Sequence, residues 1–161
     1  MTFKFSRRAA IASSVAAILT RPVWAQEATV HEVQMLNADP DNPRARQVFI
    51  PRVVVAQPGD TIRFVGVDRG HNSESIAEMM PEGAEGWEGK INDDVEVTVE
   101  VPGFYGYKCT PHATVGMVGL VIVQGEGMMD NLDAAQGVRQ RGRARQVWDE
   151  IWEEVDGLEL A

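Results

Sequence analysis

Hydrophobic and polar residues alternate in short blocks along most of the chain. Six segments rich in Val, Ile, Phe and Tyr recur between turns that contain Pro or Gly, at 29–36, 48–57, 61–67, 94–101, 104–109 and 117–123. The clearest, DVEVTVEV, places Val95, Val97, Val99 and Val101 on one face, as a strand with one buried face requires. Strands of this length and spacing predict an antiparallel β-sandwich. Residues 72–91, rich in Gly and Glu, predict a long connection with at most one helical turn.

The hydrophobic period changes after residue 125. Residues 131–138 predict a short helix, and a longer amphipathic helix of about four turns follows. Its apolar stripe consists of Val147, Trp148, Ile151, Trp152 and Val155. Packing of this stripe on the sandwich is favoured over a docking surface for a partner helix.

The first 25 residues predict a cleaved signal peptide rather than part of the fold. Lys4, Arg7 and Arg8 precede an apolar run at 9–19, and small residues end the segment at Ala25; the run is too short to span a bilayer. The two arginines favour a twin-arginine signal, with an ordinary Sec signal as the alternative. We therefore expect a periplasmic protein with three segments, a signal peptide at 1–25, a sandwich at 26–125 and a helical extension at 126–161.

The charge balance excludes some partners. The whole chain carries a formal net charge of −9, and removal of four leader Lys and Arg residues takes it to −13. Such acidity argues against binding to nucleic acids or to anionic membranes. The chain also contains a single cysteine, Cys109, which rules out an internal disulfide. A buried inert thiol, a reactive thiol and a metal ligand remain as interpretations.

Residues around Cys109 favour the metal ligand. In KCTPHATVGMVG, Cys109 ends one predicted strand, His112 lies in the loop, and Met117 begins the next strand. His71 follows another strand, after Gly70. Each residue alone would most often be structural, but two imidazoles, a thiolate and a weak thioether together are the ligand set of a blue-copper electron-transfer site. Zinc is disfavoured because thioether is a poor zinc ligand.

These motifs resemble the cupredoxin family of blue copper proteins and, within it, the pseudoazurins. The resemblance rests on GHN, on the Cys-x₂-His-x₄-Met spacing, on MLN, PGDTIRF and PEGAEGWEGKIND, and on the two-helix tail. It implies an all-β, cupredoxin-like Greek-key sandwich of eight strands with two C-terminal α-helices. It also implies one type 1 copper ion bound by His71 Nδ1, Cys109 Sγ, His112 Nδ1 and, weakly, Met117 Sδ.

The same resemblance implies roles for neighbouring residues. The backbone N–H of Asn72 would donate to the thiolate, and its side chain would tie this loop to Thr110. Pro111 stands where another N–H could reach the sulfur, and proline has none. His112 would be the electron port, within an apolar patch formed by Pro111, Ala113, Val115 and Met35.

We expect a periplasmic carrier that shuttles single electrons from a respiratory donor, such as a haem cytochrome, to a nitrite, nitrous oxide or peroxide reductase. It would act as a monomer, without enzyme activity or membrane insertion, and would dock transiently at the His112 patch. Basic residues at Arg44, Arg46, Arg69, Lys90 and Lys108 would orient acidic partners such as copper nitrite reductase, or would be ordinary solvated charges. A copper carrier or chaperone is the alternative function. An enzyme is disfavoured because His31 is the only histidine outside the site.

Overall fold

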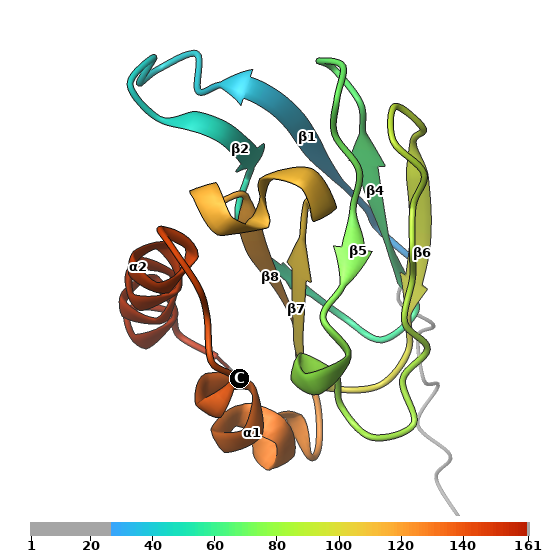
Figure 1. The fold of residues 1–161 in the computed structure, drawn as a ribbon. Helices are drawn as coiled ribbons and strands as arrows, with labels where there is room; N and C mark the ends of the chain where they lie inside the picture. Colours follow the sequence, from blue (N-terminus) through green and yellow to red (C-terminus); the bar gives the residue numbers. More distant parts are fainter. Residues whose placement is uncertain (1–26, 161) are drawn as a thin grey trace, which may run out of the picture.

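The computed structural model describes residues 27–160, so the predicted signal peptide lies outside the described residues. Eight strands form two four-stranded sheets that face each other (Figure 1). The first sheet has the order β2-β1-β4-β6, and the second has the order β3-β8-β7-β5. Their bounds are β1 Val30–Ala38, β2 Arg46–Ile50, β3 Val53–Ala56, β4 Asp60–Val65, β5 Glu74–Ser75, β6 Val95–Val99, β7 Gly103–Lys108 and β8 Val118–Val123.

Each sheet is mixed, which corrects the expectation of a purely antiparallel sandwich. β1 runs parallel to β4, with Val33 opposite Phe64, and β3 runs parallel to β8, with Val54 opposite Val121. The other pairs in both sheets are antiparallel. Parallel neighbours need a crossover connection, and hydrophobic alternation within one strand carries no information about its partner's direction.

The segment predicted as one strand at 48–57 is two strands in different sheets. β2 ends at Ile50, a cis peptide bond joins Ile50 to Pro51, and β3 begins at Val53 in the opposite sheet. The apolar run is continuous in sequence because both halves contribute to the core. Pro51 and Arg52 connect β2 in the first sheet to β3 in the second.

An aromatic cluster fills the space between the sheets. Tyr107 on β7 packs edge-on against Phe49 and Phe64, at ring-centroid distances of 4.9 and 5.0 Å. Trp87 stacks on Phe64 at 5.6 Å. Cys109 belongs to the same buried cluster, so the predicted metal site adjoins these aromatic rings.

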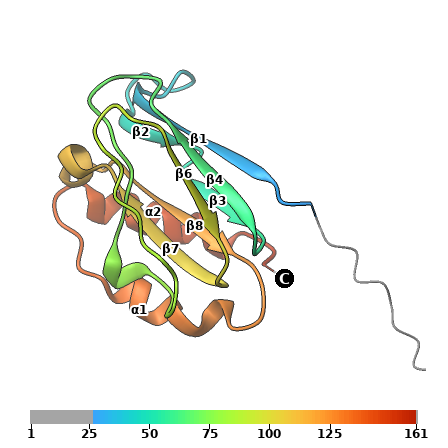
Figure 2. The same cartoon turned by 90° about the vertical axis from the view of Figure 1, so that its right-hand side faces the viewer.

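Two helices follow the sandwich, α1 Leu132–Gly137 and α2 Ala144–Asp156. They lie against the outer face of the second sheet (Figures 1 and 2). Trp148 and Ile151 are buried in one cluster with Leu120 and Ile122 of β8. All six residues of β8 are buried because one face meets the first sheet and the other meets α2. Among residues 27–160, no helix is long and apolar enough to cross a membrane.

Candidate metal centre

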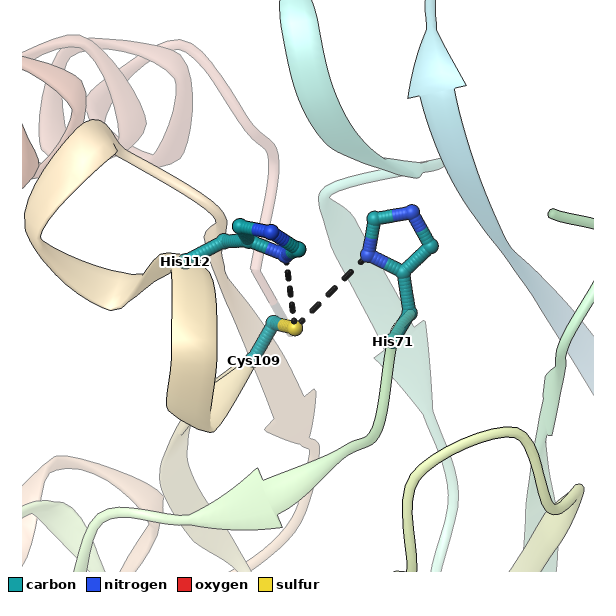
Figure 3. A group of neighbouring side chains, drawn as sticks. All are labelled: His71, Cys109 and His112. Atoms are coloured by element: carbon teal, nitrogen blue, oxygen red, sulfur yellow. Dashed lines mark hydrogen bonds between the residues drawn. The ribbon is translucent and has the colours of Figure 1, made fainter. Parts of the chain in front are cut away.

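Three predicted ligands converge at one end of the sandwich. His71 lies in the connection between β4 and β5, Cys109 directly follows β7, and His112 lies in a short 3₁₀ helix, η2, at Thr110–Val115. One ligand atom from each lies within 4.8 Å of the others. Figure 3 shows both imidazoles turned toward the cysteine sulfur.

The two histidines present the same ring nitrogen to the thiol. Cys109 Sγ is 3.7 Å from His71 Nδ1 and 3.4 Å from His112 Nδ1. The ring centroids are 5.0 Å apart, with an interplanar angle of 57°. The rings therefore diverge around the sulfur rather than stack, so a small ion could be reached by all three donors.

A hydrogen bond fixes the tautomer of His71. Its Nε2 is 3.1 Å from Asn37 Oδ1, and because an amide oxygen only accepts, Nε2 carries the proton. The lone pair is then on Nδ1, the atom that faces Cys109. Binding of the distal ring nitrogen to a fixed acceptor is how proteins orient metal-ligating histidines, so the donor set fits a metal ion.

The electrostatics of the site also favour a metal. Burial of the His71 ring, together with repulsion from His112, lowers its pKa, while Asp68 opposes this effect. Burial and repulsion both favour the neutral form of His71, which is the form that binds a metal. Burial raises the pKa of the Cys109 thiol despite hydrogen bonds from the backbone N–H groups of Asn72 and His112. A soft cation in place of the proton would relieve this burial cost.

Asn72 joins the two ligand-bearing segments. Its Oδ1 accepts from Thr110 N at 2.8 Å, and its Nδ2 donates to Thr110 Oγ1 and to Gly89 O, each at 3.0 Å. Thr110 Oγ1 in turn donates to Glu74, which also pairs with Lys108 at 3.2 Å. The structure thus brings the side chains of Asn72 and Thr110 into contact. Glu74 and Asn37 were not predicted, because these contacts join positions far apart in the chain.

Met117 is placed by the backbone of the ligand loop. Cys109 N donates to Met117 O at 2.9 Å, and Met117 N donates to His112 O at 3.1 Å. The side chain of Met117 is fully buried in the same cluster as Cys109. The loop from Cys109 to Met117 is therefore closed on itself, with Pro111 in the first turn of η2.

Only one of the converging groups reaches the surface. Cys109 and His71 are fully buried, whereas His112 is half-buried. Pro111 and Val115 are exposed around it. Met35, which the sequence placed in this patch, is fully buried, because it points from β1 into the core between the sheets.

The chain is similar to known copper-binding proteins in sequence and in fold. Residues 38–124 match the copper binding proteins of the plastocyanin/azurin family. The pseudoazurin of Paracoccus pantotrophus is 45% identical over 139 residues, which cover 86% of this chain and 92% of that protein. The crystal structure of pseudoazurin from Methylobacterium extorquens superposes with a TM-score of 0.71 at 36% identity, over 78% of this chain and 98% of that one. Pseudoazurin from Hyphomicrobium denitrificans gives 0.70 at 35% identity, over 78% and 97%.

Proposed function

The chain belongs to the pseudoazurins, within the plastocyanin/azurin family of copper-binding proteins, and we propose on that premise that it shuttles single electrons in the bacterial periplasm. Membership of this family carries three properties: the cupredoxin fold, copper as cofactor and electron transfer. Its members are electron carriers rather than enzymes. Its compartment, its ligand residues and its partners are our proposals. We further propose the division into a twin-arginine signal peptide at 1–25, a sandwich at 26–125 and a helical extension at 126–161.

We assign copper to His71 Nδ1, Cys109 Sγ, His112 Nδ1 and, more weakly, Met117 Sδ. Bound copper would supply a centre that cycles between Cu(I) and Cu(II). The observation that carries the assignment is the convergence of both Nδ1 atoms on Sγ, at 3.7 and 3.4 Å, with the His71 tautomer already fixed by Asn37.

The protein's own residues would keep the site in one arrangement during both halves of the cycle. Cys109 and Met117 adjoin the paired strands β7 and β8. The side-chain amide of Asn72 forms hydrogen bonds with both the backbone N–H and the hydroxyl of Thr110. A site held in this way needs little rearrangement when its charge changes by one. Burial of Cys109 and His71 also keeps water and oxidants away from the thiolate.

His112 is the proposed electron port because its ring connects the buried site with the surface. Exposed Pro111 and Val115 surround it, and a small apolar patch suits a redox encounter that must form and dissociate quickly. Four exposed basic residues would orient an acidic partner: Arg44, Arg46, Arg69 and Lys90. Lys108 contributes less because Glu74 neutralises it.

The physiological partners that we propose are a haem cytochrome as donor and a nitrite, nitrous oxide or peroxide reductase as acceptor, with copper nitrite reductase as the first to test. The protein would meet them as a monomer. A copper carrier, the alternative function, would need to release its metal readily, and the full burial of Cys109 and His71 disfavours this.

The visible spectrum tests the ligand assignment. The mature protein with one equivalent of Cu(II) should show an intense thiolate-to-copper band that ascorbate bleaches and reoxidation restores. Cys109→Ser and His71→Gln should abolish the band. His31→Gln is the matched control and should keep it, because His31 pairs with Asp60 instead. A pale complex, or unchanged colour in Cys109→Ser, would overturn the assignment and favour the copper carrier.

A further inference from the structure

A groove of about 740 Å³ lies between α2 and the segment that connects it to α1, away from the metal ligands. Arg145, Trp148, Asp149 and Trp152 line one wall; their spacing of three, four and seven residues puts them on one face of α2. Arg139 and Arg141 line the other wall. Figure 1 shows the connecting segment passing beside α2.

The groove is lined by positive charges although the protein as a whole is acidic. The chain as a whole has a net charge of −9, yet Arg139, Arg141 and Arg145 are exposed within seven residues of one another. Among residues 27–160, none of the three forms an ion pair. Asp149 is the one acidic residue in the lining. Three unpaired guanidinium groups around one concave surface favour an anionic occupant.

Trp148 gives a second, independent indication. Its side chain is 3% exposed and stacks on Trp152 with ring centroids 5.7 Å apart. Its indole Nε1 is buried without a hydrogen-bond partner in the described part of the chain. A buried donor without an acceptor is costly, and a ligand that shifts the ring enough to open Nε1 to the groove would satisfy it with an acceptor.

The groove is connected to the ligand loop by the backbone. Arg143, between the two walls in sequence, donates its N–H to Thr114 O at 2.9 Å. Thr114 belongs to η2, the same 3₁₀ helix that carries His112. A partner that touches the exposed edge of His112 could therefore also reach the arginines.

We propose that this groove binds carboxylate side chains of an acidic segment on a partner protein, as a second contact beside the His112 patch. The arginines would pair with the carboxylates, and Trp148 would donate to one of them. The identity of the partner as a redox protein rests on the proposed function, whereas anion binding in the groove does not.

The indole signals of the reduced, copper-loaded mature protein test the proposal. In ¹H–¹⁵N spectra, addition of a hexaglutamate peptide should shift the Trp148 and Trp152 indole signals. The Trp87 signal is the internal control and should stay in place, because its N–H is already bonded to Ser73 Oγ at 2.9 Å. The visible spectrum after reoxidation checks the copper site separately, so failure of the groove and failure of the proposed function are distinguishable.

Two variants attribute the binding to the groove. Arg145→Gln should weaken hexaglutamate binding about threefold, as expected for one exposed charge pair, and Trp148→Phe should weaken it about tenfold through loss of a donor to a charged group. Arg63→Gln removes another exposed charge, which pairs with Glu96 and Asp94 outside the groove. It should change binding by no more than about 1.5-fold, because only the screened, long-range effect of the lost charge remains. Equal losses in Arg145→Gln and Arg63→Gln would overturn the proposal. So would an equal response to succinate at matched carboxylate concentration, which would identify a site for small carboxylates instead.

Discussion

Asn72→Ala should separate the stability of the fold from the tuning of the copper site. The change removes three hydrogen bonds, two with Thr110 and one with Gly89 O. At about 0.5–1.5 kcal/mol each, their loss should lower the free energy of unfolding by about 1.5–4.5 kcal/mol. The corresponding fall in melting temperature is roughly 5–16 °C for a domain of this size.

A second asparagine supplies the matched control. Asn131 binds both backbone atoms of Phe104, at 3.0 and 2.8 Å, at the opposite end of β7 from Cys109. Asn131→Ala should therefore also cost about 1–3 kcal/mol. It should leave the copper site unchanged, because no ligand loop depends on this contact.

The two variants should differ in reduction potential. When Asn72 no longer holds Thr110, the backbone N–H of Asn72 should donate less strongly to the Cys109 sulfur. The thiolate then stabilises Cu(II) more, and the potential should fall on the order of 20–40 mV. Cyclic voltammetry and urea unfolding of the same preparations measure both quantities. Equal potentials in the two variants, with Asn72→Ala destabilised as expected, would refute the role assigned to this side chain.

Three further predictions concern separate parts of the molecule. Pro111→Ala should raise the reduction potential, because the new N–H in the first turn of η2 can donate to the sulfur; an unchanged or lower potential in voltammetry would contradict this geometry. Asp60 is buried, which opposes ionisation, but N–H groups of Gln57, His31 and Thr29 hold its pKa below the ordinary value of 3.8. Its stabilising effect is thus present above pH 3.8 and is lost as the pH falls through the lower folded pKa, so the stability advantage over Asp60→Asn should shrink in that range; an advantage independent of pH in acid urea titrations would refute it. Ile151→Ala should destabilise the whole domain by about 2–5 kcal/mol in one cooperative transition, since Ile151 is fully buried against β8; a separate early transition of the helices in calorimetry would show that the extension unfolds independently.

Much of this fold can be predicted because local patterns report burial. The alternation in DVEVTVEV and the stripe on α2 each indicate which face is covered. Strand direction and sheet membership depend on distant partners, so the run at 48–57 conceals a change of sheet at Pro51. The antiparallel expectation failed for the same reason.

The residues of the site likewise differ in whether the sequence alone could identify them. Cys109, His112 and Met117 stand out in the sequence because one loop contains them at a distinctive spacing, and His71 because it follows a strand end; the structure brings His71, Cys109 and His112 together. Asn37 and Glu74 could not be assigned roles from sequence alone. Asn37 binds His71, a contact that exists only after the two sheets have packed, and Glu74 contacts Thr110, which requires β5 to have paired with β7.

Because His71 lies between the two sheets, a metal ion bound to it would link one sheet to the other. Its ring contacts Asn37, at the end of β1 in one sheet, and faces Cys109, which follows β7 in the other. Cys109 is 38 residues from His71, and closing a loop of that length in an unfolded chain costs about 3 kcal/mol of entropy. An ion held by both residues would act as a reversible cross-link in a chain whose single cysteine cannot form an internal disulfide. Amide exchange near η2 should therefore accelerate most when copper is removed.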